Sequence, residues 1–417
     1  MEHRNLIAVL CLISAFILPI NAELKYVDAS RLTLIGKVMP TPENVYHRVD
    51  TVKYNDMPFQ VKRLFTHSAG LVVSFKTNSP TVAARWTTKG KGVMGNVTPI
   101  CDRGLDLYMN DGGKWIPVGA GTPSAGKAEQ ERVITKNLKP GVHRFLLYLP
   151  LFEEVRSLEI GVDEGSFIEA EPSPFRHTVL MYGSSILHGA CASRSGLAYP
   201  ARMSRNTGIN FVNYGLSGNG KMEAAVADML KDIDADAFIL DCMPNPSPEE
   251  ITERTQYLVN TIRKYHQGTP IIMIETYMRE NGYSDQAVHD RCTRQGEAFV
   301  KQYELLKKQG IKDLYLIRDN HAIGTDHEGS VDGTHPNDLG FDRMVEQYQP
   351  QIMRILKNPG IKLKKKKGLE FFEPFSFYGN RLEMATYGRD NARLIPLTTN
   401  GSITLYPSRL GWTLSLP

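Results

Sequence analysis

The 417-residue sequence has little net charge, few cysteines, and no long apolar run after its first residues. The formal net charge is +4, and most of that excess is local because five lysines cluster at positions 362 and 364–367. A charge this small gives no reason to expect a nucleic-acid partner. With 41% hydrophobic residues over this length, the chain can bury a sizeable core and hold two domains.

The one long apolar run lies at the N-terminus. His3 and Arg4 precede apolar residues 6–20, and Ala22 closes the run, an order typical of an export signal. We therefore expect a signal peptide over 1–22, a mature chain that starts near Glu23, and a periplasmic or secreted protein. No later segment approaches the roughly 20 apolar residues of a spanning helix, so no stable membrane span is expected. An uncleaved anchor is the alternative, which the shortness of the run disfavours.

The five cysteines are widely and irregularly spaced. Cys11 lies within the apolar run, and export would make the other four possible disulfide partners, with three full pairings. Buried free thiols are the equal alternative. The absence of a CxxC pair or a His/Cys cluster excludes a recognisable zinc site. The four cysteines are Cys101, Cys191, Cys242 and Cys292.

Residues 23–170 show short apolar runs broken by Gly, Pro, Asn and Asp. Runs of this length with turn signals between them, such as "NDGG" at 110–113, indicate antiparallel strands in a sandwich. No catalytic residue types group together here, so we expect this all-β, jelly-roll-like domain to support its neighbour and to form a rim for the substrate. The Pro-containing stretch 169–175 is the predicted linker.

Over residues 175–357 the period changes. Apolar strand-like runs alternate with longer amphipathic segments, the pattern of a parallel sheet covered on both faces. Ser247, Pro248 and Glu250 mark a helix start as N-cap, first helical residue and capping-box acid. The five predicted strands are 179–182, 211–214, 237–240, 271–274 and 314–317.

Polar residues follow several of these strands, and ligands bind beyond the carboxyl ends of such strands. "YGSSI" places Ser184 and Ser185 after the first strand. Asp332 precedes His335 by three residues, a spacing that lets the carboxylate accept the Nδ1 hydrogen bond and leaves Nε2 free to act as a base. A serine at a strand end is then the natural nucleophile. Gly218 and Asn245 supply a backbone N–H and a side-chain amide that can donate to an oxyanion.

Four ordered blocks carry a resemblance to the SGNH hydrolases, or GDSL-type esterases. They are "YGSSI", "NYGLSGNG", "DCMPNPS" and "DGTHPND". The resemblance implies a flavodoxin-like, three-layer α/β/α domain, a Ser185–His335–Asp332 catalytic set, and an oxyanion hole from Ser185, Gly218 and Asn245. Ser184 stands where the family usually has Asp, and Pro244 precedes Asn245, so substrates of better-known members do not transfer.

"GLDLY", residues 104–108, matches a Gly-x-Asp-Leu-Tyr motif in the N-terminal β-domain of a bacterial branch of these acylhydrolases. Export, this domain order and the resemblance point to a cofactor-independent serine esterase that removes short acyl groups, above all acetyl, from a small acyl ester or an acetylated glycan. Two alternatives remain: a non-catalytic carbohydrate-binding surface protein with the same fold, and a lipid or thioester acylhydrolase.

The sequence allows more than one interpretation of three further features. His188 is either a pocket residue or a structural histidine. The acid- and histidine-rich stretch 319–335 could hold a metal in principle, but its histidines lack the i, i+4 spacing of a zinc protease, so no metal is expected. Residues 358–417 have no derivable role: a poorly ordered extension, a small appended β-element and an altered reading frame after the lysine-rich stretch are the alternatives.

Overall fold

The computed structural model describes residues 23–90, 94–358, 360, 361 and 363, together with the backbone of four short strands between 377 and 415. The predicted signal peptide, residues 1–22, and most of the C-terminal extension lie outside the described residues. Gly368–Pro417 form a separate unit, in which Phe377–Tyr378 (β16) pairs with Arg381–Leu382 (β17) and Thr404–Ser408 (β18) pairs with Gly411–Ser415 (β19).

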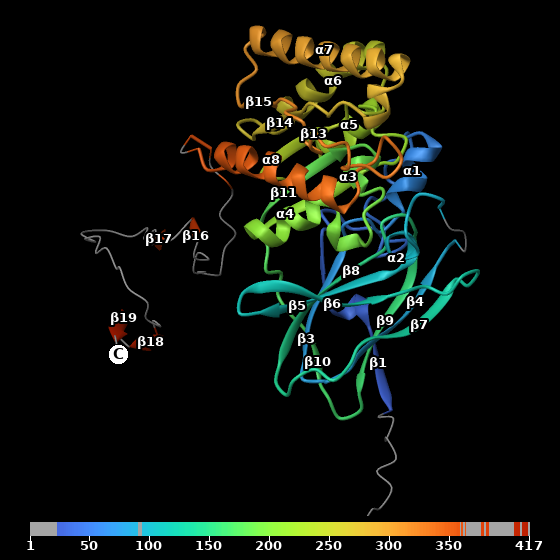
Figure 1. Ribbon diagram of the computed structural model, residues 1–417, viewed down its shortest axis with the longest axis vertical. Helices are drawn as coiled ribbons and strands as arrows, with labels where there is room; N and C mark the ends of the chain where they lie inside the picture. Colours follow the sequence, from blue (N-terminus) through green and yellow to red (C-terminus); the bar gives the residue numbers. More distant parts are fainter. Residues whose placement is uncertain are drawn as a thin grey trace, which may run out of the picture. The chain divides into compact units, whose positions relative to one another are not determined.

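The first half forms the predicted β-sandwich (Figure 1). All of its strand pairs are antiparallel, and apolar side chains from both sheets, including Trp86, Phe75 and Phe145, fill the space between them. Sheet order is β1-β9-β4-β7 in one layer and β10-β3-β8-β5-β6 in the other, with β2 paired to β3. The strands are β1 Leu24–Asp28, β2 Thr33–Ile35, β3 Val72–Thr77, β4 Val82–Thr88, β5 Leu105–Asp111, β6 Lys114–Gly121, β7 Glu129–Thr135, β8 His143–Tyr148, β9 Val155–Asp163 and β10 Ile168–Ala170.

Three short helical segments interrupt this half: η1 (Ala29–Arg31), α1 (Phe59–Phe65) and α2 (Pro99–Arg103). The sequence patterns did not predict them. α1 contributes Val61, Leu64 and Phe65 to the core of the second half rather than to the sandwich. Arg48 fixes this segment, because its buried guanidinium donates to the carbonyls of Leu64, His67, Asn213 and Gly215. The N-terminal half therefore supplies part of the neighbouring core.

The second half is the predicted three-layer α/β/α domain. Its five strands are parallel and lie in the order β12-β11-β13-β14-β15, the 2-1-3-4-5 order of flavodoxin-like folds. All five strand predictions are confirmed, since the strands are β11 Arg176–Gly183, β12 Ile209–Gly215, β13 Ala237–Asp241, β14 Ile271–Ile274 and β15 Leu314–Ile317.

Helices cover both faces of this sheet, as Figure 1 shows. Along β11 the side chains alternate: Leu180 and Tyr182 face one core, whereas Val179 and Met181 face the other. The first core includes side chains of α5 (Ala224–Leu230), α6 (Pro248–Tyr265) and α7 (Gln286–Lys308). The second includes side chains of α3 (Ser185–His188), α4 (Tyr199–Thr207) and α8 (Asp338–Leu356). The short helices η2 (Ser195–Leu197) and η3 (Glu280–Tyr283) lie in the loops.

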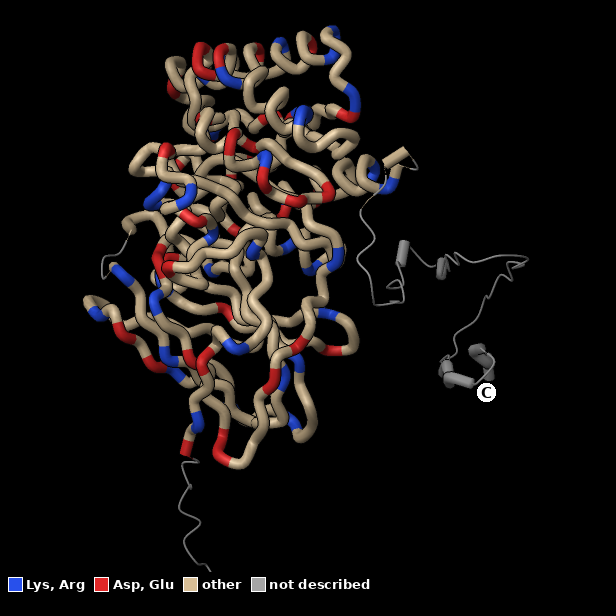
Figure 2. Tube along the Cα trace, turned by 180° about the vertical axis from the view of Figure 1, so that it is seen from behind, with Lys and Arg blue, Asp and Glu red and all other residues tan. Residues whose placement is uncertain are grey.

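Local signals explain where the helices begin. The predicted capping box is present at α6, where Ser247 accepts the Glu250 N–H and Glu250 accepts the Ser247 N–H. A cap of this kind stabilises a helix by roughly 1 kcal/mol. No helix among the described residues has both the length and the apolar character needed to cross a bilayer. Lys and Arg are interspersed with Asp and Glu along the described chain in Figure 2.

Candidate active site

Ser185 lies at the carboxyl end of β11. From β11 the chain first connects to β12 on one side and then continues to β13 on the other, so Ser185 lies at the switch point of the sheet, where α/β folds bind ligands. β11 ends at Gly183, and Ser184 then caps α3 by accepting the Ile186 N–H through its hydroxyl. Ser185 is therefore the first residue of a short helix. The residue is 5% exposed, so it lies in a largely enclosed position.

The predicted catalytic residues are brought together. His335 Nε2 lies 2.9 Å from Ser185 Oγ, and His335 Nδ1 lies 2.8 Å from Asp332 Oδ2. Asp332 Oδ1 also accepts the backbone N–H of His335 at 2.8 Å, which fixes the carboxylate on its loop. The three side chains form a continuous hydrogen-bonded chain with the geometry of a serine nucleophile, a base and an orienting acid.

Several donors bond to the Asp332 carboxylate. Burial by itself would raise the pKa of this carboxyl, but hydrogen bonds from His335 and Asn96 outweigh it and hold the pKa well below its ordinary value. The carboxylate is consequently ionised across the working pH range and can stabilise a protonated imidazole. Asn96 belongs to the β-sandwich half, and no sequence pattern singled it out.

The predicted oxyanion donors, Gly218 and Asn245, belong to the loops that follow the two strands on either side of β11. Gly218 adopts a left-handed conformation (φ 70°) in the loop after β12. The Asn245 amide follows β13 and donates one hydrogen bond to the Asn219 carbonyl at 2.5 Å, which links the second and third sequence blocks. Gly220, also left-handed, permits the close approach of this loop, because a Cβ there would lie 2.1 Å from the Gly183 carbonyl oxygen.

His188 is fully buried. Its Nδ1 accepts the Ser217 N–H at 3.3 Å, and its Nε2 donates to the Leu151 carbonyl at 2.5 Å, which requires the neutral Nε2–H tautomer. Burial first, and then the charge of Arg48, holds its pKa well below the ordinary value. Of the two sequence interpretations, the geometry favours the structural one: this imidazole connects the sandwich to the residue before Gly218.

The four described cysteines are buried free thiols. Cys191 lies next to the site, and its Sγ, an Asp332 oxygen and a His335 nitrogen lie within 4.8 Å of one another, the one such group of potential metal ligands among the described residues. Burial, and next the Asp332 charge, raises the pKa of Cys191 to about 12, so it stays a thiol. Both His335 ring nitrogens already have hydrogen-bond partners.

In the acid- and histidine-rich stretch 319–335, Asp326 pairs with Arg343 and His327 pairs with Glu280, so these two side chains are engaged in ion pairs with different partners.

The Gly-x-Asp-Leu-Tyr motif joins the two halves. Asp106, on β5, is buried and accepts two hydrogen bonds from Arg194 and one from the Gly196 N–H. Tyr108 accepts from the same Arg194 at 2.9 Å and lies under the Arg205 guanidinium at 4.0 Å. The motif thus holds the loop that follows Ser185 against the sandwich.

Comparisons with known proteins agree with this architecture. Residues 24–168 match the N-terminal GxDLY model of SGNH-hydrolase-type esterases, and residues 176–353 match the GDSL-like lipase/acylhydrolase family. A comparison with curated protein sequences finds no significant match.

Solved structures give the same result. A protein from Bacteroides ovatus ATCC 8483 that is assigned to the GDSL-like lipases is 52% identical, with a TM-score of 0.79 over 82% of this chain and 100% of its own. The salicylyl-acyltransferase SsfX3 of a tetracycline pathway is 20% identical (TM-score 0.63, 81% and 99% covered). A family two carbohydrate esterase from Clostridium thermocellum, solved with cellohexaose, is 13% identical (TM-score 0.53, 69% and 93% covered). The last two show a shared fold.

The identity to the B. ovatus protein over its full length, together with the two matched models, shows the family. The chain belongs to the GDSL-like lipase/acylhydrolase family, with an N-terminal GxDLY domain, and is an ester hydrolase.

Proposed function

We propose that this ester hydrolase is an exported serine esterase that removes short acyl groups, in the first place acetyl, from carbohydrates. The observation that carries the catalytic part is the hydrogen-bonded chain from Ser185 through His335 to Asp332. The carbohydrate part is supported by the fold shared with family two carbohydrate esterases, one of which was solved with cellohexaose. Export is supported by residues 1–22 of the sequence.

In this mechanism Ser185 Oγ attacks the acyl carbon of the ester while His335 Nε2 takes the hydroxyl proton. The carbonyl oxygen becomes an oxyanion, which the N–H groups of Ser185 and Gly218 and the Asn245 amide stabilise. The tetrahedral intermediate collapses as His335 gives the proton to the leaving alcohol, which leaves an acyl-serine. Water then repeats the sequence with His335 as base and releases the carboxylic acid. No step requires a cofactor.

A Ser185→Ala variant tests the nucleophile. With 4-nitrophenyl acetate as substrate, kcat should fall by at least about 10³-fold, because loss of a catalytic serine removes most of the rate enhancement. A fluorophosphonate should label the wild-type chain at Ser185 and leave the variant unlabelled. Wild-type turnover in the variant, or absence of labelling in an intact wild type, would favour the non-catalytic binding protein.

Acyl-chain preference separates the remaining alternatives. We expect the wild type to hydrolyse acetylated sugars faster than palmitoyl esters. Preference for the palmitoyl ester would remove the carbohydrate proposal, favour a lipid acylhydrolase, and leave the serine mechanism in place.

N-terminal sequencing of protein secreted from the native host should find Glu23 or a neighbouring residue at the mature end.

A further inference from the structure

A cleft of about 370 Å³ lies between the two halves of the chain, a size within the range of small-molecule sites. Its lining comes from α1, the residues around α2, the segment before β9, and the loop after β12. The catalytic mechanism uses none of the side chains that line it.

Two lining residues are close in sequence to residues of the proposed site. Ser217 directly precedes Gly218, and Met94 is two residues before Asn96, which donates to Asp332. A third lining residue, Phe152, stacks its ring on His188 at 4.4 Å, and His188 Nδ1 accepts the Ser217 N–H. Through His188 the cleft lies next to α3, the helix that begins at Ser185.

Two carboxyl groups give the cleft its polarity. Asp102 is buried, and burial followed by the charge of Glu153 raises its pKa to about 6. Glu153 is half-buried and accepts the Gly90 N–H through Oε2 at 2.9 Å. Carboxyl oxygens accept hydrogen bonds from hydroxyl groups and repel anions. Arg63, at the exposed rim, donates from Nε to the neighbouring Gln60.

His67 supplies an unsatisfied polar atom. The residue is 6% exposed, and Nδ1 has no hydrogen-bond partner among the described residues. Burial, then the charge of Arg48, lowers the pKa of His67 to about 3, so the ring is neutral at any working pH. A buried polar atom without a partner costs about 1–3 kcal/mol, and the protein itself encloses this one, so it is not a contact point for a ligand in the cleft.

We propose that this cleft binds the alcohol half of the substrate as a neutral pyranose ring. Asp102 and Glu153 form hydrogen bonds with its hydroxyl groups, and Phe152 and Met94 provide the apolar contact. Paired carboxyl acceptors beside an aromatic wall suit a polyhydroxylated ring better than an acyl chain or a phosphate. This inference rests on the proposed function, because it places the sugar of the acetyl ester.

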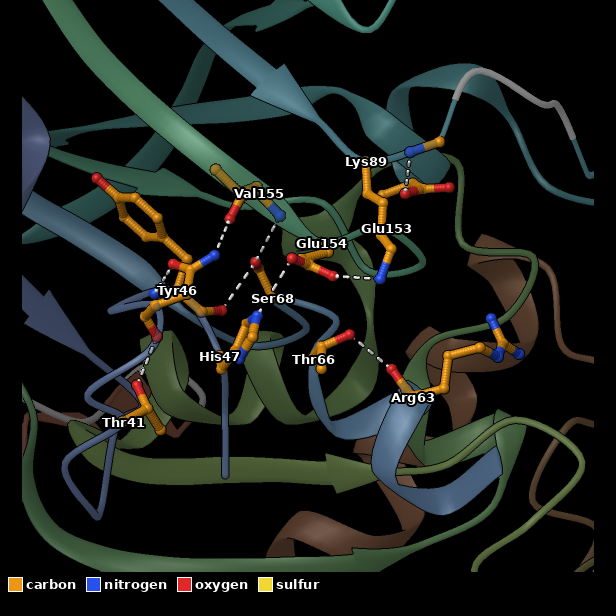
Figure 3. Close-up of polar contacts among 12 residues, drawn as sticks. Thr41, Tyr46, His47, Arg63, Thr66, Ser68, Lys89, Glu153, Glu154 and Val155 are labelled. Carbon is orange, nitrogen blue, oxygen red and sulfur yellow. Dashed lines mark hydrogen bonds and ion pairs between the residues drawn. The ribbon is translucent and has the colours of Figure 1, made fainter. Parts of the chain in front are cut away.

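Glu153→Gln provides the test, with Glu154→Gln as the matched control. Glu154 follows directly in sequence, but its carboxylate pairs with Lys89 at 3.1 Å and with His47 at 3.4 Å (Figure 3). Each variant is assayed with acetylated methyl glucopyranoside and with 4-nitrophenyl acetate, which share the acyl group and differ in the alcohol. We expect Glu153→Gln to raise KM for the sugar ester about tenfold and to leave both the aryl ester and the control unchanged.

A second variant, Met94→Trp, fills the cleft from its exposed rim and should have the same selective effect. It should also weaken inhibition of 4-nitrophenyl acetate hydrolysis by methyl glucopyranoside. If the variants alter both esters equally, or neither, the cleft does not bind the sugar, while wild-type turnover of the aryl ester still supports the serine esterase. Inactivity of the wild type toward both esters would overturn the esterase mechanism and the cleft proposal together.

Discussion

Asn96 of the β-sandwich half donates a hydrogen bond to Asp332 of the hydrolase half, with Nδ2 2.9 Å from Oδ2. The same Oδ2 accepts from His335 Nδ1, so the sandwich contacts the group that orients the proposed base. This contact gives the N-terminal half a part in positioning the proposed catalytic residues, beyond the support expected from its sequence.

Replacing Asn96 with Ala should therefore lower kcat about tenfold without a change in KM. A hydrogen bond to a charged group contributes about 1.5–3 kcal/mol, and this partly exposed one belongs at the lower end. Asn96→Asp should lower kcat further, by an amount that shrinks in high salt, because it sets two carboxylates side by side. Asn78→Ala is the control, since it removes one hydrogen bond, to the Phe167 N–H, within the sandwich. Equal effects of Asn96→Ala and Asn78→Ala on kcat would refute the positioning role.

Asp106 should matter for stability more than for chemistry. Asp106→Ala leaves Arg194 and the Gly196 N–H without their buried acceptor, and breaking such a pair costs about 3–5 kcal/mol. Chemical denaturation should show this loss in the free energy of unfolding. Adding Arg194→Met should recover part of it, because the uncompensated charge is then gone. A double variant as unstable as the sum of the two single variants would contradict coupling through this ion pair.

The sequence predicted those elements whose structure is determined by a local pattern of residues. Five apolar runs predicted the five strands of the parallel sheet, and Ser247, Pro248 and Glu250 predicted the start of α6. The blocks also indicated that Ser185 and His335 would meet, because each follows a strand of one sheet and ligand sites form at that edge.

Features that depend on contacts between the halves were not predicted. Asn96 has no periodicity or motif around it, and its position follows from the packing of two chain segments 236 residues apart. α1 sits within a half dominated by strands, yet its apolar side chains complete the core of the other half. The two interpretations of His188 differed in the partners of its ring nitrogens, which only the tertiary structure supplies.

Asp241, whose backbone carbonyl accepts the Ser184 N–H, should make the stability of the fold depend on pH. It is fully buried, and burial raises its pKa to about 7, while the hydrogen bond from Tyr199 opposes that shift. The folded state therefore holds this proton more tightly than the unfolded chain does. Its contribution to stability is fully present below the unfolded pKa of about 4 and is lost as pH rises toward 7.

Asp241→Asn removes this titration. From pH 4 to pH 8 the wild type should lose the stability that this carboxyl contributes, whereas the variant should not. The difference in unfolding free energy between the two should therefore change by on the order of 3 kcal/mol in favour of the variant. Tyr199→Phe should make the pH dependence of the otherwise wild-type chain steeper, because it deletes the one bond that favours the carboxylate. Parallel stability curves for the wild type and Asp241→Asn would show that this carboxyl does not titrate in that range.

Alanine variants of Gly220 and Gly208 can distinguish the cost of a left-handed backbone conformation from the cost of a steric clash. Both are left-handed, with φ of 70° and 71°. A Cβ at Gly208 would meet no atom within 4 Å, whereas one at Gly220 would lie 2.1 Å from the Gly183 carbonyl oxygen, two residues before Ser185. Gly208→Ala should then cost only the conformational penalty, about 1–2 kcal/mol of stability, and leave kcat unchanged.

Gly220→Ala bears the same conformational penalty and must also move either its own loop or the Ser185 turn. Because Gly218 lies on that loop, we expect kcat on 4-nitrophenyl acetate to fall at least about tenfold in protein that is still folded, a loss consistent with displaced oxyanion donors. Circular dichroism establishes the folded fraction, and fluorophosphonate labelling reports whether Ser185 remains activated. Normal kcat in folded Gly220→Ala would mean that the loop after β12 adapts without disturbing the site, and the close approach of Gly220 to Gly183 would then have no part in positioning the oxyanion donors.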